Sequence, residues 1–127
     1  MSKARLMPED RTVVFDFDGV INPYIKGWLG VTEIPEAPVE GVRELLAKLK
    51  AAGFRSVIMS SRALADNGET AIVDYLKRHD LWNFIDAVVT EKIPAMVYID
   101  DRAICFTGKT EGLFEQIVNF NSWTGNL

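Results

Sequence analysis

Residues 12–19 read TVVFDFDG, so two carboxylates stand at the end of an apolar run. The run is short and rich in β-branched and aromatic residues, which predicts a buried strand over residues 12–18. Because side chains alternate along a strand, Asp16 and Asp18 should leave it on the same side. Gly19 then allows a sharp turn where a ligand would arrive. Two acids at this position predict a cation between them, and we expect Mg²⁺, which carboxylate and phosphate oxygens bind.

Strands and helices alternate along the rest of the chain. The apolar spacing predicts further strands at 54–59, 86–90, 96–99 and 104–106, and helices at 38–53, 66–78 and 110–119. In the last helix we expect Leu113, Phe114, Ile117 and Val118 to be buried. This alternation predicts βαβ units around a mainly parallel sheet, in an α/β fold.

Composition limits the function classes. The chain has 127 residues, 48% hydrophobic and 25% charged, as expected for one globular domain. A net charge of −4 gives no basic surface, so we expect neither membrane binding nor non-specific nucleic-acid binding. Cys105, the single cysteine, excludes a disulfide framework and lies between apolar residues, which predicts a core position. The first residues resemble neither a signal peptide nor a membrane span, so we expect a cytoplasmic protein.

Polar residues gather where the predicted strands end. The second strand is followed by Ser60, Ser61 and Arg62, the third by Lys92, and the fourth by Asp100 and Asp101. In open parallel sheets, ligands bind beyond the carboxyl ends of the strands. We therefore expect these side chains to share one site with Asp16 and Asp18.

The chemistry of that site follows from its charges. Three or four carboxylates close together resist ionisation unless a divalent cation is bound, and such a cation in turn takes an anionic oxygen ligand. Lys92 and the Ser60 hydroxyl suit a phosphoryl group, as does the Ser61 amide. Asp16, held more rigidly by the strand, is the expected nucleophile and metal ligand, and Asp18 the general acid and base.

The ordered motifs FDFDGV at 15–20, VIMS at 57–60, Lys92 and YIDD at 98–101 resemble those of the haloacid dehalogenase superfamily of mostly Mg²⁺-dependent phosphatases. The resemblance implies a three-layer Rossmann-like domain over residues 1–127. It also implies metal binding by Asp16, Asp100 and the main-chain carbonyl of Asp18, with Asp101 supporting the site directly or through a water. Phosphate binding is implied for Ser60, Ser61, Lys92 and Gly19.

The gaps between the motifs narrow the subtype. In this superfamily a cap domain is often inserted after the first strand or after the third. Both segments are too short for one here, so the chain resembles a capless member with a small flap at about 20–37. The resemblance implies an open site for a phosphorylated substrate, which a homo-oligomer can close. A shorter likeness, in SSR at 60–62 and DDR at 100–102, links it to the 3′-phosphatase domain of polynucleotide kinase/phosphatases.

Several alternatives stay open at this stage. Arg62 can bind substrate or pair with Asp101 or another carboxylate, and the flap residues Tyr24, Lys26 and Trp28 can contact substrate, the body or a second subunit. A phosphomonoesterase with an aspartyl-phosphate on Asp16 is the leading function. A phospho-acceptor switch and a non-catalytic interaction domain are the alternatives, whereas dehalogenation is disfavoured because it needs neither a general acid nor a metal cluster.

Overall fold

Four short strands form one parallel sheet in the order β3-β2-β1-β4. They are β1 (Thr12–Asp16), β2 (Arg55–Met59), β3 (Ala87–Val89) and β4 (Val97–Ile99). The computed structural model describes residues 8–125. In β1, one of the two inner strands, Phe15 is in register with Ile58 of β2 on one side and with Ile99 of β4 on the other. The prediction of an α/β fold with a mainly parallel sheet is confirmed, and the fold is compatible with a Rossmann-like arrangement.

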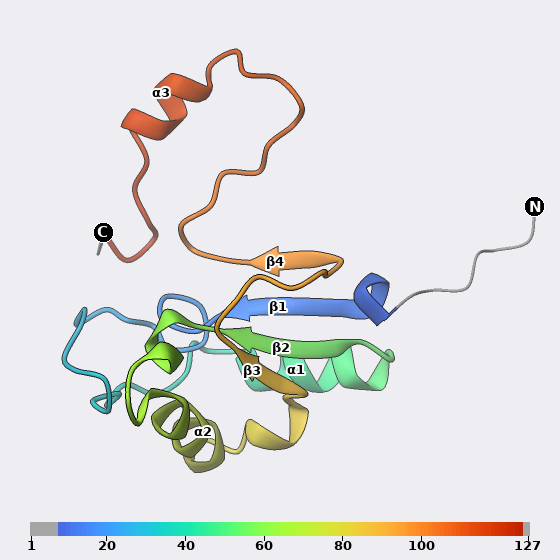
Figure 1. Cartoon of the computed structure of the whole chain (residues 1–127), viewed down its shortest axis with the longest axis vertical. Coiled ribbons are helices and arrows are strands. Elements are labelled where there is room, and N and C mark those ends of the chain that lie inside the picture. The colour runs from blue at the N-terminus through green and yellow to red at the C-terminus, as the bar shows by residue number, and fades with distance from the viewer. Residues whose placement is uncertain (1–7, 126–127) are drawn as a thin grey trace, which may run out of the picture.

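Helices α1 (Val42–Ala51) and α2 (Gly68–Arg78) connect β1 to β2 and β2 to β3. Because parallel crossovers are right-handed and both lead the same way across the sheet, both helices cover the same face, as Figure 1 shows. Gly41 and Asn67, at the two N-caps, have left-handed φ values of 88° and 66°. This turn at Gly41 starts α1 four residues after the predicted position at 38.

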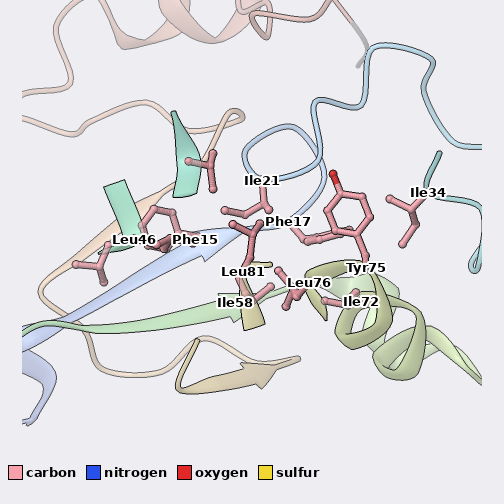
Figure 2. Close-up of a cluster of buried hydrophobic side chains, with 12 residues drawn as sticks. Phe15, Phe17, Ile21, Ile34, Leu46, Ile58, Ile72, Tyr75, Leu76 and Leu81 are labelled. Atoms are coloured by element: carbon pink, nitrogen blue, oxygen red, sulfur yellow. The ribbon is translucent and has the colours of Figure 1, made fainter. Parts of the chain in front are cut away.

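One hydrophobic core lies between that sheet face and the two helices (Figure 2). Val13 and Phe15 alternate with Val14 and so point toward the helices, together with Ile58 from the neighbouring strand. The side chains that complete this buried cluster are Phe17, Ile21, Ile34, Val42, Leu46, Ile72, Tyr75, Leu76 and Leu81. The core therefore holds β1 rigidly at the point where its last residue, Asp16, emerges.

The predicted flap, residues 20–37, is irregular and mostly exposed or half-buried, but it is anchored to the core at a few residues. Ile21 and Ile34 are buried in the core, and the Tyr75 hydroxyl donates to the Glu36 carbonyl oxygen at 2.8 Å. Inside the flap, the amide of Lys26 donates to the Glu36 carboxylate at 3.3 Å. These contacts tie the flap to α2 and set its position beside the strand ends.

The segment that follows β4 differs from prediction. Residues 104–106 form no strand, and the last helix, α3 (Leu113–Val118), is shorter than the predicted 110–119. Three of its predicted core residues are exposed, with Phe114 at 71%, Ile117 at 58% and Val118 at 59%. Cys105 is also exposed, which contradicts its predicted core position.

The reason for this difference is visible in Figure 1, where a long connection carries α3 away from the sheet. Within residues 8–125, α3 does not pack extensively on another element, so the expected third layer is not built by a helix. Three 3₁₀ helices complete the fold: η1 (Pro8–Arg11), η2 (Ser61–Leu64) and η3 (Trp82–Phe84). None of the described helices has both the length and the apolar character needed to cross a membrane.

Candidate metal and phosphate site

Three carboxylates meet at the carboxyl ends of the two neighbouring strands β1 and β4. Asp16 is the last residue of β1, and Asp100 and Asp101 directly follow β4. One oxygen from each of the three lies within 4.8 Å of the others. The sequence predicted this convergence, and it follows from the parallel pairing of β1 with β4.

The electrostatics of this acid cluster favour a bound cation. Burial raises the pKa of Asp16 from 3.8 to about 8, and the charge of Asp100 and a hydrogen bond with Asp101 act in the same direction. The Asp101 Oδ1 atom is buried without a hydrogen-bond partner. An unsatisfied buried carboxylate oxygen beside two other acids suits a hard divalent cation such as Mg²⁺. Asp101, left open as direct or indirect support, is therefore placed as a candidate ligand alongside Asp16 and Asp100.

Gly19 makes room for this cluster. Its φ is +94°, and a Cβ atom there would lie 2.1 Å from Asp101 Oδ2, so no larger residue fits. Its amide donates to the Asn22 carbonyl oxygen at 2.7 Å. The amide is thus used inside the turn, and the absence of a side chain at Gly19 leaves room for Asp101. The predicted phosphate contact of Gly19 has no support from the described geometry.

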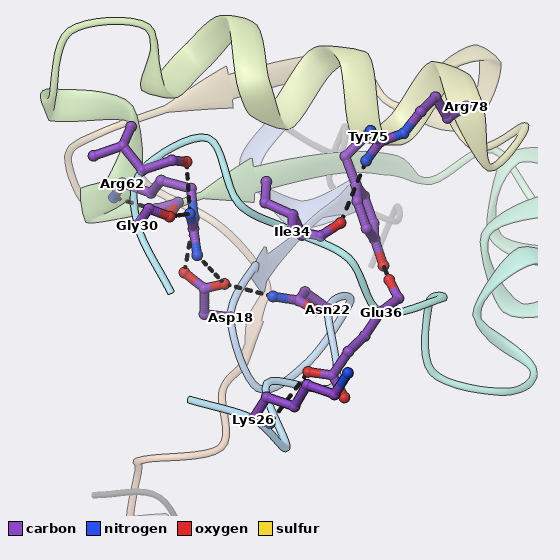
Figure 3. Close-up of polar contacts among 11 residues, drawn as sticks. Asp18, Asn22, Lys26, Gly30, Ile34, Glu36, Arg62, Tyr75 and Arg78 are labelled. Carbon is purple, nitrogen blue, oxygen red and sulfur yellow. Dashed lines mark hydrogen bonds and ion pairs between the residues drawn. The ribbon is translucent and has the colours of Figure 1, made fainter. Parts of the chain in front are cut away.

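Asp18 lines the same cavity as Asp16. Its own neighbours are Arg62 and Asn22, as Figure 3 shows. The strand ends at Asp16, two residues earlier than predicted, because the chain turns at residues 17–22. Asp18 Oδ1 accepts from Arg62 Nη2 at 2.9 Å and from Asn22 Nδ2 at 2.8 Å, and Oδ2 accepts from Arg62 Nε at 3.2 Å. Of the alternatives for Arg62, the structure has the ion pair, with Asp18 as its partner.

The two serines after β2 line the cavity. The Ser60 Oγ accepts from the Arg62 amide at 3.1 Å and caps η2, which leaves its hydroxyl hydrogen able to donate to a ligand. Ser61, which begins η2, is exposed. The cavity measures about 290 Å³ and is lined by Asp16, Asp18, Tyr24, Trp28, Ser60, Ser61, Asp100, Asp101 and Arg102.

Lys92 does not line this cavity. It is exposed in the connection from β3 to β4, and its ammonium nitrogen lies 5.4 Å from the centre of the Tyr98 ring. The hydroxyl of Tyr98 bonds to both backbone groups of Ile93, which fixes this connection on the sheet. The predicted phosphate-binding role of Lys92 therefore has no support from the described geometry.

Three residues contribute to the site although none of them was predicted from the sequence to do so. Asn22, which holds Asp18, follows it by only four residues, and an amide beside a turn is a recognisable signal. Arg102 lines the cavity directly after the acid pair. Trp123 donates from Nε1 to the Gly19 carbonyl oxygen at 2.7 Å across 104 residues, a contact that no local pattern indicates.

A comparison of the chain with protein-family models, curated proteins and solved structures finds no significant match.

Proposed function

We propose that the protein is a Mg²⁺-dependent phosphomonoesterase that works through an aspartyl-phosphate on Asp16. The observation that carries this proposal is the acid cluster of Asp16, Asp100 and Asp101 in one cavity with Asp18 and Ser60. The resemblance of the four ordered motifs to the haloacid dehalogenase superfamily supports it. So does the exposure of Ser61, Asp100 and Arg102 in the cavity lining, which leaves access for a phosphate at the end of a larger molecule.

The acid cluster would hold Mg²⁺ through its carboxylate oxygens. The bound ion supplies positive charge, which lets Asp16 ionise at neutral pH and polarises a phosphoryl oxygen. Asp16 ends a buried strand, so its oxygen is held in one direction, as a nucleophile requires. The Ser60 hydroxyl donates to another phosphoryl oxygen and helps to orient the group for attack.

The reaction then proceeds in two steps. An Asp16 oxygen attacks phosphorus, the bond between phosphorus and the ester oxygen breaks, and Asp18 gives its proton to the leaving alkoxide. In the second step Asp18 takes a proton from water, the water oxygen attacks phosphorus, and the bond to Asp16 breaks. Inorganic phosphate leaves, and both carboxyl groups return to their starting states.

The test is hydrolysis of p-nitrophenyl phosphate, followed by a panel of nucleotides, sugar phosphates and 3′-phosphorylated oligonucleotides. Activity should need Mg²⁺ and should fall by at least about a thousandfold in Asp16→Asn, as expected for loss of a nucleophile. In Asp18→Asn we expect a loss of about a hundredfold or more, since general acid–base catalysis contributes that much.

Asp80→Asn is the matched control. Asp80 is an exposed carboxylate whose ion pair with Arg43 lies outside the cavity, so its removal should leave activity unchanged. Full activity in Asp16→Asn would overturn the mechanism. A stable phosphoryl group on Asp16 without turnover would favour the phospho-acceptor switch instead.

A further inference from the structure

We infer that Arg62 is a positioning residue that orients the proton-transferring oxygen of Asp18 and couples that orientation to the closed flap. This inference rests on the proposed phosphatase function, in which Asp18 is the general acid and base. Within residues 8–125, the guanidinium of Arg62 bonds to Asp18, Gly30 and Val31 and to neither Asp16 nor Asp100, so it acts through Asp18.

The hydrogen bonds to the two oxygens of the Asp18 carboxylate are asymmetric. Oδ1 receives two hydrogen bonds, from Arg62 Nη2 and Asn22 Nδ2, whereas Oδ2 receives one, from Arg62 Nε, which at 3.2 Å is the longest of the three. The side chain of Asp18 keeps 20% of its surface exposed, and it lines the cavity. Oδ2 therefore has the free lone pair, and it is the oxygen that exchanges a proton with substrate and water.

The guanidinium of Arg62 also contacts the flap. Nη1 of Arg62 donates to the carbonyl oxygens of Gly30 and Val31 at 2.7 and 2.6 Å. The ring of Trp28 lies over the guanidinium at 4.4 Å. One side chain thus binds both the acid–base residue and three neighbouring residues of the flap, as Figure 3 shows for Asp18 and Gly30.

The Arg62 cation is also buried. Only 1% of the Arg62 side chain is exposed, and a buried guanidinium is stable only when its donors are satisfied. The donors divide between Asp18 and the flap carbonyls, so neither set alone accounts for the buried charge. Movement of the flap would uncover Arg62 and weaken its hold on Asp18, which couples flap closure to readiness for proton transfer.

The planar fork of arginine is needed for this arrangement. Nε and Nη2 reach the two oxygens of one carboxylate while Nη1 points the other way, toward the flap. A lysine ammonium keeps the charge but is a single point of donation on a flexible chain. Arg62→Lys therefore removes the orientation of Asp18 without removing the positive charge.

The first experiment compares kcat/KM for p-nitrophenyl phosphate and phenyl phosphate in the presence of Mg²⁺. Phenolate is the poorer leaving group, so its departure depends more strongly on a proton from Asp18. In Arg62→Lys the ratio of the two kcat/KM values should shift by about tenfold against phenyl phosphate, as it should in Asp18→Asn. The double variant should show no larger shift than Asp18→Asn, because both changes remove one function.

Arg43→Lys is the matched control. It makes the same change from guanidinium to ammonium at an exposed ion pair, with Asp80, outside the cavity. Its leaving-group ratio should equal that of the wild type. A merely structural role of Arg62 would lower both kcat/KM values equally and leave the ratio unchanged.

The second experiment needs no activity. Trypsin should cleave after the exposed flap residue Lys26 faster in Arg62→Met and in Asp18→Asn than in the wild type, at a temperature where circular dichroism shows all three folded. Asp18→Asn is informative because the Gly30 and Val31 carbonyl oxygens accept from Arg62, whereas the bond of Asp18 within the flap is to Asn22, near its start. Faster cleavage there would support coupling through Arg62.

The outcomes separate the inference from the function on which it rests. An unchanged leaving-group ratio in Arg62→Lys, or unchanged cleavage in both flap variants, overturns the inference while Asp16→Asn remains inactive. A wild type without phosphatase activity, or an active Asp16→Asn, overturns the proposed function itself. If Arg62→Met fails to fold, the leaving-group test still decides, because it uses Arg62→Lys, which keeps the buried charge.

Discussion

Two regions of the molecule differ in what covers their helices: the helix-covered side of the sheet, and the C-terminal segment, residues 103–125. Helix α1 of the first and α3 of the second carry apolar residues at the same helical spacing but bury them very differently. In α1, Leu46 is fully buried, whereas in α3 Ile117 remains 58% exposed. Helix α1 lies against β2, and α3 lies apart from the sheet (Figure 1). Helical periodicity therefore identifies the apolar face of a helix but not the surface that covers it.

The acid cluster joins these two regions. Asp16 comes from the central strand of the packed region, and Asp100 and Asp101 come from the edge strand that leads into the C-terminal segment. Trp123 returns from that segment and donates to the Gly19 carbonyl oxygen. The candidate site thus depends on the rigid region for Asp16 and on the edge of the sheet for its other acids.

The largest effect should come from breaking the packed side. Leu46→Ala removes a fully buried side chain from α1 and should lower the free energy of unfolding by about 3 kcal/mol. Urea denaturation of the metal-free protein measures the change. Leu45→Ala, one position along and 45% exposed, is the control and should cost clearly less. Equal losses for the two leucines would contradict the burial of α1.

The next effect concerns the acids at the junction. The folded protein without metal keeps the Asp16 proton up to a pKa of about 8, because of burial and then of Asp100, whereas the unfolded chain releases it near 3.8. Unfolding between these values releases a proton, so stability should fall as pH rises from about 4 to about 8, by on the order of 2 kcal/mol after solvent screening.

Urea denaturation in a chelator at several pH values in this range tests the effect. In Asp16→Asn the contribution of this group disappears, so the difference between wild type and variant isolates it from other titrating groups. Added Mg²⁺ should stabilise the wild type most at the upper end of the range, because the cation binds the ionised carboxylate. A wild type that gains stability relative to Asp16→Asn as pH rises without metal would contradict the raised pKa.

A smaller effect should come from the link between the regions. Trp123→Phe keeps an aromatic ring but removes the donor to the Gly19 carbonyl oxygen, and should cost about 1 kcal/mol, as for a typical hydrogen bond. Hydrogen exchange should also become faster at the amides after residue 120. Unchanged exchange there would mean that this bond does not hold the C-terminal segment to the turn.

The smallest effect should come from α3. Ile117→Ala trims an exposed side chain and should change the free energy of unfolding by less than about 0.5 kcal/mol. The same denaturation measurement serves as for Leu46→Ala. A loss as large as that for Leu46→Ala would show that α3 buries this residue against a partner in solution, and would remove the contrast between the two helices.

Much of the fold was predictable because its signals are local. The alternating and helical spacings identified β1 to β4, α1 and α2 within a few residues, and the parallel sheet followed from their order. The predicted strand at 104–106 failed because a strand needs a neighbour to pair with, which an apolar run does not supply. Cys105 was misplaced for the same reason.

The acids of the candidate site were equally predictable, because each stands at the end of a recognisable strand. Lys92 follows a strand end that the sequence identified, but the path of the connection after β3 leaves it outside the lining of the cavity. The pairing of Arg62 with Asp18 spans 44 residues, and the sequence left it as one of several alternatives. Such contacts depend on which distant segments of the chain meet in space, and local sequence patterns do not show this.

Backbone periodicity depends on neighbouring residues, so the amino-acid sequence placed the strand ends within two residues, with Asp16, Asp18, Asp100 and Asp101 at or just after them. The tertiary structure decided that Asp101 joins Asp16 and Asp100 while Asp18 turns to Arg62. It also decided that α1 is covered and α3 is not. Both outcomes depend on which surfaces meet in space, and burial and charge pairing act through those contacts and not along the chain.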